Sequence, residues 1–487
     1  MEQIKFDFNN MFSFSVGQNH GVTEAELQEF LPKAKGAHEH LSKVLGDAES
    51  RVNLGLEWAR LPYQDAKIIN QIQSLGRVIS AKYHNVIFLG IGGSYLGLKA
   101  AQDALGLPYA NEFPQKKTPG IYFEGNNLDP DTLTVLLKHL DPRKTFAVVI
   151  SKSGETTETK AAFTVVEAWL KKAVGKNYGR QIIAITDPEG GSLRKKVDAE
   201  QKKDILSFRS LPLLKGVGGR YSELNMGLLH LAVIGVDIKK ILKGAASMHQ
   251  LCGKASILDN PAYMYAILHT ILYKQKNKPL AILMPFSETL NSTADWYVQL
   301  LAESLGKKFA RRIEFRNGRE EWLIDRNNIV NTGRTPISAH GTGDLHSIQQ
   351  NSIEGENNKV VTFIRVEKFR KECIVPAKAD ILSGKSFSEL IRLAQEATEW
   401  ALVREERPNC TIILPEVSPY YWGALLFFFE MATAFEGELL NVNAFDQPGV
   451  EGYKNYMYYK LGKPGLSPEI AEKIKSTPLI KNPKYIL

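Results

Sequence analysis

The sequence predicts an α/β fold made of two parallel β-sheets, each sandwiched by helices. Short apolar segments alternate with segments whose apolar residues have helical spacing, an order typical of parallel sheets covered on both faces. This alternation occurs between residues 86 and 186 and starts again near residue 280. The chain has 487 residues, a length that favours two domains over a single core.

The first series of strands follows a polar N-terminal region that we expect to be helical up to about Ile79. Each predicted strand is a short apolar segment that ends in glycine or polar residues. The predicted strands are VIFLG (86–90), GIYFEG (120–125), FAVVIS (146–151) and IIAIT (182–186). The helices predicted between them include DTLTVLLKHL (131–140) and KAAFTVVEAWLKKA (160–173).

The second series of strands follows a helical region that extends from Glu223 to about Tyr273. Its predicted strands are LAILMPF (280–286), VVTFIRV (360–366) and CTIILPE (410–416). Its predicted helices include STADWYVQLLAESLG (292–306) and GALLFFFEMATAFEG (423–437). The repeated order indicates two similar α/β domains.

The predicted domain organisation has five parts. They are an N-terminal helical layer (1–74), a first α/β domain (75–245), a helical linker (246–277), a second α/β domain (278–450) and a C-terminal helix and arm (451–487). The tail from Asn455 is an arm with too little apolar content to fold alone.

The composition favours a cytoplasmic globular protein with a small anionic partner. Hydrophobic residues make up 44% of the chain, and the formal net charge is +8. The basic residues are dispersed among acidic ones, which favours a phosphate ligand over nucleic acid. No apolar segment approaches the roughly 20 residues of a membrane-spanning helix, and the N-terminus does not resemble a signal peptide. The three distant cysteines argue against a disulfide framework and a zinc site.

The segment GIGGSYLG (90–97) places glycines between a predicted strand and a helix. Backbone N–H groups of such a turn can contact a phosphate or a hydroxyl group. One alternative is a dinucleotide site in which Glu124, at the end of the next strand, contacts a ribose. The glycine spacing disfavours this site, because Tyr95 occupies the third position of the fingerprint. The other alternative is a tight turn without a ligand.

The segment SKSGETTET (151–159) also follows a predicted strand and begins a helix. It has five hydroxyl side chains in nine residues, and the first N–H groups of the helix add donors. Such a loop can bind a dianionic phosphate. The alternative is an ordinary N-cap with Glu158 in a capping box, although the hydroxyl groups are denser than a cap requires.

Two further segments carry a cation and a carboxylate. GVGGRYSELN (216–225) places Arg220 among glycines, where its guanidinium could stabilise an anionic oxygen; the alternative is a solvated surface arginine. In the helix 292–306, Gln299 and Glu303 are four residues apart and share one face with apolar residues. Apolar neighbours would raise the basicity of Glu303 and make it a useful proton acceptor; the alternative is a solvated glutamate.

The last two segments contain a histidine and a lysine. HGTGDLHSIQQ (340–350) suggests a catalytic imidazole at His346. A metal site with His340 and Asp344 is disfavoured because the spacing fits no zinc pattern, and a structural histidine is the other alternative. FDQPGVEGYKNY (445–456) places Gln447 on a turn and Lys454 on the next helix, where a solvated lysine is the alternative.

The order of these segments is similar to that in glucose-6-phosphate isomerases, particularly bacterial ones. The resemblance rests on GIGGS, SKSGETTET, GGRYS, QLLAESLGK, GTGDLHS and FDQPGVEGYK, and it spans roughly residues 85–460. It implies two sugar-isomerase (SIS) α/β domains and a homodimer that shares its active sites. It also implies an isomerase of glycolysis and gluconeogenesis that interconverts glucose 6-phosphate and fructose 6-phosphate without a metal or cofactor.

The resemblance also implies roles for individual residues. Glu303 would be the base that moves a proton between C1 and C2, and Arg220 would stabilise the enediolate. His346, contributed by the partner subunit, and Lys454 would open the sugar ring. The residues implied in substrate binding are Gly93, Ser94, Ser151, Lys152, Ser153, Thr156, Gly219, Gln299 and Gln447. Glu155 departs from the family pattern, and we expect it to point away from the phosphate.

Three other functions remain as alternatives. A non-catalytic sugar-phosphate-binding regulator would need the phosphate loop but not Glu303, His346 and Lys454, and all three are present. A dual phosphoglucose/phosphomannose isomerase would use the same residues. An NAD-dependent oxidoreductase would need the glycine spacing that GIGGS lacks.

Overall fold

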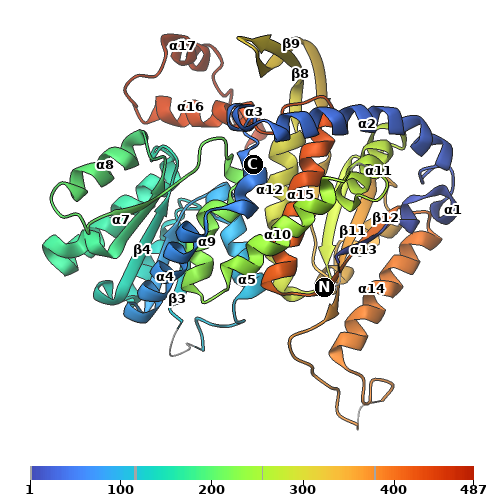
Figure 1. Ribbon diagram of the computed structural model, residues 1–487, viewed down its shortest axis with the longest axis horizontal. Coiled ribbons are helices and arrows are strands. Elements are labelled where there is room, and N and C mark those ends of the chain that lie inside the picture. Colours follow the sequence, from blue (N-terminus) through green and yellow to red (C-terminus); the bar gives the residue numbers. More distant parts are fainter. Residues whose placement is uncertain (1–2, 114–117, 255, 378–379) are drawn as a thin grey trace. The chain divides into compact units, whose positions relative to one another are not determined.

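The computed structural model describes residues 3–113, 118–254, 256–377 and 380–487. The chain forms two compact units, Met1–Ala444 and Phe445–Leu487. The first unit contains two five-stranded sheets and a two-stranded hairpin (Figure 1). None of the helices in the described ranges combines the length and hydropathy that crossing a membrane requires.

The first sheet has the strand order β3-β2-β4-β5-β6, and all its strands are parallel. Its strands are β2 (Asn85–Leu89), β3 (Gly120–Glu124), β4 (Thr145–Ile150), β5 (Ile182–Thr186) and β6 (Arg209–Pro212). The flanking helices are α4 (Ala66–Lys82), α5 (Leu96–Leu105), α6 (Pro130–His139), α7 (Thr157–Val174), α8 (Gly191–Gln201) and α9 (Glu223–Val233).

Helices cover both faces of the first sheet because alternate side chains of each strand point in opposite directions. Ile87 and Leu89 of β2 pack in a buried cluster with Phe163 of α7. Phe88, between them, points to the other face, where its ring lies 5.0 Å from that of His230 on α9. This double burial explains why the strands are continuous apolar segments.

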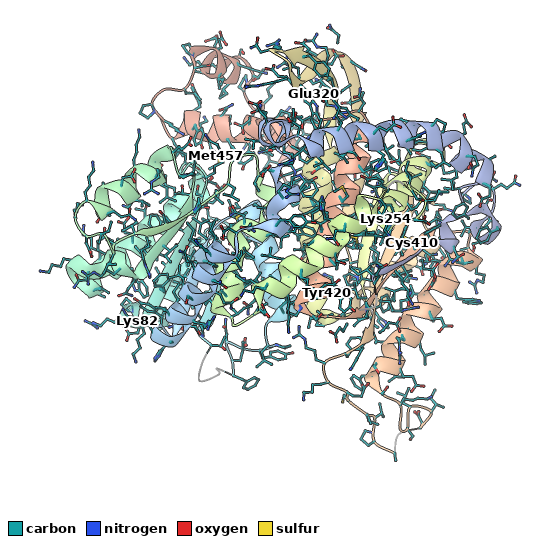
Figure 2. The ribbon with its side chains drawn as sticks, in the orientation of Figure 1. Lys82, Lys254, Glu320, Cys410, Tyr420 and Met457 are labelled. Carbon is teal, nitrogen blue, oxygen red and sulfur yellow. The ribbon has the colours of Figure 1, made fainter. Side chains whose placement is uncertain are left out.

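The second sheet has the order β1-β12-β11-β7-β10. Its strands are β1 (Lys5–Asp7), β7 (Leu280–Pro285), β10 (Thr335–Ser338), β11 (Lys359–Lys368) and β12 (Asn409–Glu416). All pairings are parallel except that of β1 with β12. The buried Cys410 lies on the inner strand β12 (Figure 2).

Both faces of the second sheet are also covered. Phe363 of β11 packs with Leu402 of α14, whereas the neighbouring Thr362 hydroxyl lies 3.3 Å from that of Tyr265 on α11. The helices after the first sheet are α10 (Ile238–Cys252), α11 (Pro261–Gln275), α12 (Asn291–Leu305), α13 (Gln349–Ile353), α14 (Phe387–Arg404) and α15 (Pro419–Leu439). Helix α15 is buried on nearly all sides.

The α/β class and its parallel sheets are confirmed. All seven predicted strands are present, with ends that differ by at most two residues. The expectation that the N-terminal region is purely helical is wrong at one point. Although this region contains α1 (Ser13–Val16), α2 (Glu24–Gly46) and α3 (Ala48–Leu54), strand β1 adds an antiparallel edge to the second sheet. The domain boundaries proposed from the sequence stay a prediction.

The sequence analysis did not predict the hairpin formed by β8 (Lys307–Arg316) and β9 (Arg319–Thr332). Asn317 and Gly318 form its turn with φ angles of 53° and 77°, the left-handed backbone of a tight hairpin. The second unit, Phe445–Leu487, contains α16 (Glu451–Lys460) and α17 (Pro468–Ser476).

Candidate active site

Helix α12 holds the proposed base. Gln299 and Glu303 lie one turn apart, and Gln299 Nε2 donates to Glu303 Oε1 at 3.0 Å. The Glu303 side chain is 31% exposed, so a ligand in solvent can reach it. The apolar residues expected beside it, Trp296 and Leu300, are themselves fully buried. The immediate partners of the carboxylate are therefore hydrogen-bond donors.

Arg220 is buried, with 2% of its surface exposed, and it binds the second oxygen of the base. Its Nη1 donates to Glu303 Oε2 at 3.1 Å, its Nε to Ser304 Oγ at 2.8 Å, and its Nη2 to the carbonyl of Ala444 at 2.6 Å. These three bonds from separate nitrogens fix the guanidinium plane, and its charge is directed at the carboxylate.

The two glycine segments pack against each other next to this pair. A Cβ added to Gly93 would lie 2.1 Å from the carbonyl oxygen of Gly219 and 2.8 Å from the amide nitrogen of Arg220. A Cβ on Gly92 would lie 3.0 Å from Gln299 Nε2. Glycines are required here because backbone approaches backbone, which is a different use from the pyrophosphate contact of a dinucleotide fold. Gly93, Gly219, Arg220, Gln299 and Glu303 are thus brought together.

The segment 151–156 follows β4, which is adjacent to β2 in the sheet. Since parallel strands end at one edge, this loop and the segment Gly92–Ser94 lie at the same edge. Thr156 is the N-cap residue of α7, but its side chain accepts no capping hydrogen bond. The capping-box alternative is therefore wrong, and the first turn of α7 has no side-chain cap. Glu155 pairs with Lys160, Oε2 to Nζ 3.3 Å, and Lys152 is exposed.

The hydroxyl groups of this loop are partly engaged in shaping it. Ser151, which is buried, accepts a hydrogen bond from the Gly154 amide at 3.0 Å. Ser153 accepts one from the Glu155 amide at 3.1 Å. Each hydroxyl retains its proton for donation, so the loop can still present O–H groups to an anion.

The structure places His346 in the first unit, on a different element from Arg220 and from Glu303. It is exposed at the end of a 3₁₀ turn, Gly343–His346. Asp344 does not orient it: Asp344 accepts hydrogen bonds from the His340 amide and from Ser347 Oγ, both at 2.7 Å. Among the described residues no three His, Cys, Asp or Glu side chains gather in an arrangement that could hold a metal.

Gln447 and Lys454 belong to the second unit. Gln447 precedes a 3₁₀ turn, Pro448–Val450, and Lys454 lies on α16 with its Nζ 3.0 Å from Glu451 Oε1. Their participation in the site stays a prediction.

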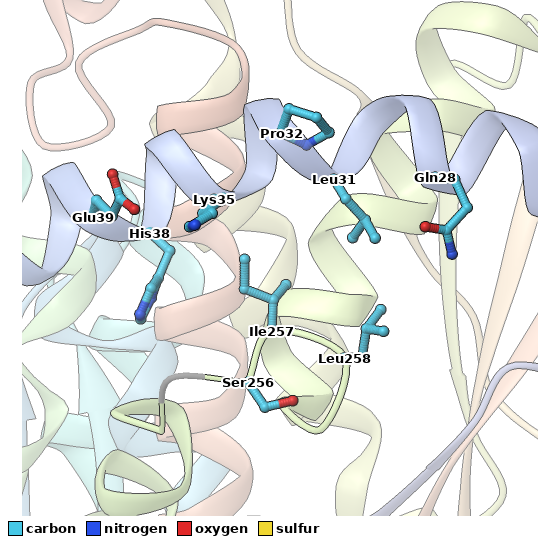
Figure 3. A pocket seen from close by; sticks show the side chains of 9 residues that line it. All are labelled: Gln28, Leu31, Pro32, Lys35, His38, Glu39, Ser256, Ile257 and Leu258. Atoms are coloured by element: carbon cyan, nitrogen blue, oxygen red, sulfur yellow. The ribbon is translucent and has the colours of Figure 1, made fainter.

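A cavity of about 780 Å³ lies elsewhere, between α2 and the segment 256–258 (Figure 3). Its lining residues are Gln28, Leu31, Pro32, Lys35, His38, Glu39, Ser256, Ile257 and Leu258. None of the residues predicted for the site lines it.

The sequence analysis missed two residues that shape the site. Ser304 binds Arg220 Nε from inside α12; a fully buried serine in a helix is a signal that a polar partner is near. Lys307, just after α12, donates from Nζ to the carbonyl of Glu303 at 2.7 Å. A lysine just beyond a helix C-terminus is the available signal, because it complements the helix dipole.

The two sheets define an α/β protein. Its glycine segments meet at a buried arginine and an accessible glutamate, and this arrangement is a candidate polar site for a small ligand. The family model described as phosphoglucose isomerase matches residues 67–332 and 352–473. The chain belongs to the phosphoglucose isomerase family.

Individual relatives agree with this assignment. The glucose-6-phosphate isomerase of Carboxydothermus hydrogenoformans is 38% identical over 99% of both chains. That of Acetivibrio thermocellus is 34% identical over 96% of this chain and 97% of the relative. A crystal structure of a hypothetical protein from Thermus thermophilus has a TM-score of 0.79 and 29% identity, and it covers 94% of this chain and 100% of its own.

A crystal structure of a glucose-6-phosphate isomerase from Chlamydia trachomatis has a TM-score of 0.74 at 22% identity. The alignment covers 94% of this chain and 90% of that one. At this identity the similarity shows a shared fold.

Proposed function

We propose that the protein interconverts glucose 6-phosphate and fructose 6-phosphate through an enediolate intermediate. The observation that carries this proposal is the contact between Arg220 Nη1 and Glu303 Oε2 at 3.1 Å, in a chain of the phosphoglucose isomerase family. The names of its relatives support the same reaction.

Glu303 acts as the base in the proposed reaction. It takes the proton from C2 of the open aldose and returns it to C1, which yields the ketose. A positioned base contributes about 10²–10⁴-fold to such a transfer. Gln299 holds one oxygen of the base, and the other oxygen exchanges its contact with Arg220 for the substrate.

Arg220 stabilises the negative charge that develops on the enediolate. Its guanidinium is always charged and is held before the substrate arrives by Ser304 and the Ala444 carbonyl. A preorganised cation in a buried site stabilises a developing oxyanion strongly because it needs little reorganisation. This role requires no metal or cofactor.

The phosphate group binds at the loop 151–156. The supporting observations are the uncapped first turn of α7 and the hydroxyl groups of Ser151, Ser153 and Thr156. Helix N-terminal N–H groups favour a dianion. Lys152 adds charge, and the segment Gly92–Ser94 at the same sheet edge completes the binding surface with Gly93 and Ser94.

Ring opening uses His346 and Lys454, and Gln447 lines the sugar. The exposure of His346 supports a homodimer in which His346 completes the site of the partner subunit. The proposed setting is cytoplasmic glycolysis and gluconeogenesis. A regulator without activity would bind the sugar phosphate but not turn it over.

A coupled isomerase assay on fructose 6-phosphate, with and without EDTA, tests the proposal. We expect turnover that survives chelation. The matched control for Glu303→Gln is Glu396→Gln, an exposed glutamate on α14, which should keep full activity. Binding of the substrate without turnover would contradict the proposal, and loss of activity with EDTA that zinc or manganese restores would contradict the metal-free mechanism.

A further inference from the structure

Two further glutamates of the first unit, separate from the Arg220–Glu303 pair, are buried. Glu223 is the first residue of α9, and Glu430 lies in the middle of α15. Each is 2% exposed. Buried carboxylates are rare unless a cation or a proton compensates them, so this pair calls for a physical explanation.

The contacts of Glu223 indicate a shared proton. Trp296 Nε1 donates to Glu223 Oε1 at 2.9 Å. The second oxygen, Oε2, is fully buried and receives no hydrogen bond from any N–H or hydroxyl donor in the described ranges. The side chain of Glu223 also interacts with that of Glu430. Because ionised carboxylates only accept hydrogen bonds, this contact needs a proton on one of the two.

The electrostatics agree with this geometry. Burial raises the pKa of Glu223, and burial together with repulsion from Glu223 raises the pKa of Glu430 well above its usual value. The buried Tyr221, on the 3₁₀ turn Gly219–Tyr221, is a titratable side chain that interacts electrostatically with both glutamates. Helix α12 supplies the neutral donor Trp296, and Gly97 of α5 packs against Glu223.

Glu223 touches the elements that carry the site. Arg220 lies three residues before it, at the entrance to α9. Trp296 lies on α12 seven residues, or about two turns, before Glu303. A Cβ on Gly97 of α5, the helix after the Gly92–Ser94 segment, would lie 2.1 Å from Glu223 Cγ. The Trp296–Glu223 bond therefore joins the helix of the base to the helix that follows the arginine.

We propose that Glu223 is a positioning residue that aligns Arg220 with Glu303, and that the proton it shares with Glu430 keeps this alignment only up to an alkaline limit. When that proton leaves, two buried negative charges repel each other, and α9 and α15 separate at this point. The guanidinium then shifts relative to Glu303, and a small misplacement in an active site lowers the rate strongly. The part about catalysis rests on the proposed function.

Four variants separate the possible roles. Glu223→Gln and Glu430→Gln keep the size of the side chain and can replace the shared proton with an amide N–H, but they cannot ionise. Glu223→Ala removes the acceptor of Trp296, and Trp296→Phe removes the donor while keeping an aromatic ring. kcat, KM and the free energy of unfolding are measured for each folded variant from neutral to alkaline pH.

In the wild type, we expect the free energy of unfolding to fall as pH rises from the ordinary glutamate pKa of about 4.3 up to the raised folded pKa, so that it is already falling at neutral pH. We expect kcat to fall only when the native state loses the proton. Both Gln variants should keep kcat at neutral pH and lose both of these falls. Glu223→Ala and Trp296→Phe should lower kcat about tenfold at all pH values, with little change in KM.

Two outcomes would overturn the inference. One is an alkaline fall in stability that persists unchanged in Glu430→Gln, and the other is a wild-type kcat in Glu223→Ala. The stability profile needs no substrate, so it tests the shared proton by itself. If that profile behaves as expected but the wild type shows no isomerase activity, the proposed function fails, and with it the catalytic half of the inference.

Discussion

Arg334 and Arg220, two of the buried arginines of the first unit, bind glutamates in different ways. Arg334 and Glu436 are each 1% exposed and form two parallel hydrogen bonds, of 2.8 and 2.6 Å. Arg220 is equally buried, and its Nη1 donates to one oxygen of Glu303, whose side chain is 31% exposed. Its Nε and Nη2 donate to Ser304 and to the Ala444 carbonyl.

The difference shows how the same two residue types serve different purposes. In the Arg334–Glu436 pair, the closed pair, each charge is satisfied by the other, so neither is available to a ligand. The Arg220–Glu303 pair is the open pair. In the open pair, neutral groups hold the arginine, and its carboxylate partner is free to exchange that contact for a substrate. The closed pair should therefore control stability, and the open pair should control activity.

The largest expected effect is on the open pair. Glu303→Gln keeps the shape of the side chain but removes the base, so the rate should fall by about 10²–10⁴-fold. The loss should be equal for cyclic fructose 6-phosphate and for C2-proton exchange on an open-chain analogue. The free energy of unfolding should fall less than when a fully buried pair is broken, because Glu303 is partly exposed, although the buried Arg220 loses its counter-charge. Near-normal exchange in this variant would show that Glu303 is not the base.

The corresponding change in the closed pair should reverse the pattern. Glu436→Gln leaves the buried guanidinium of Arg334 without a counter-charge, which typically costs about 3–5 kcal/mol of stability. Denaturant unfolding measures the loss, and the folded fraction should retain its specific activity. The double variant Arg334→Met/Glu436→Leu is the control and should recover much of the stability. A stable but inactive Glu436→Gln protein would contradict the division between the pairs.

A smaller effect should reveal whether the open pair works across two subunits. His346→Ala and Glu303→Gln subunits are each expected to be nearly inactive toward cyclic substrate. In mixed dimers one site keeps both wild-type residues if His346 acts on the partner, so part of the activity should return. The absence of complementation in verified heterodimers would count against a shared site.

The smallest effect concerns a partly exposed histidine that contacts two carboxylates. His40, 23% exposed, lies 2.7 Å from both Glu438 and Glu320; Glu320 lies on β9 of the hairpin (Figure 2). Hydrogen bonds that the protonated imidazole donates to these carboxylates, Glu438 first, raise the pKa of His40. Its contribution to stability is therefore present below the usual histidine pKa of about 6.5 and is lost as pH rises through the higher folded value.

His40→Gln should remove this pH dependence, and thermal unfolding on both sides of neutrality measures it. His139, which is exposed on α6, provides the control variant His139→Gln. An unchanged pH profile in His40→Gln would mean that the two carboxylates do not stabilise the protonated histidine.

Much of the fold could be predicted from the sequence because the strands are buried on both faces. Continuous apolar segments such as 146–151 have no other stable place in a globular protein. Five strands were missed: the hairpin strands β8 and β9, and the short strands β1, β6 and β10, of three or four residues each. The hairpin β8–β9 has an Asn317–Gly318 signal that could have found it, whereas β1 has only three residues and depends on its pairing with β12.

The sequence by itself determined the local parts of the site. Gln299 and Glu303 lie on one helix face because residues four apart in an α-helix point in nearly the same direction. The tertiary structure decided which of these parts meet. Arg220 and Glu303 are separated by 83 residues, and no local pattern records that distance. Gly93 against Gly219 and Glu223 against Glu430 were likewise decided by packing, because long-range contacts depend on how whole elements bury their apolar faces.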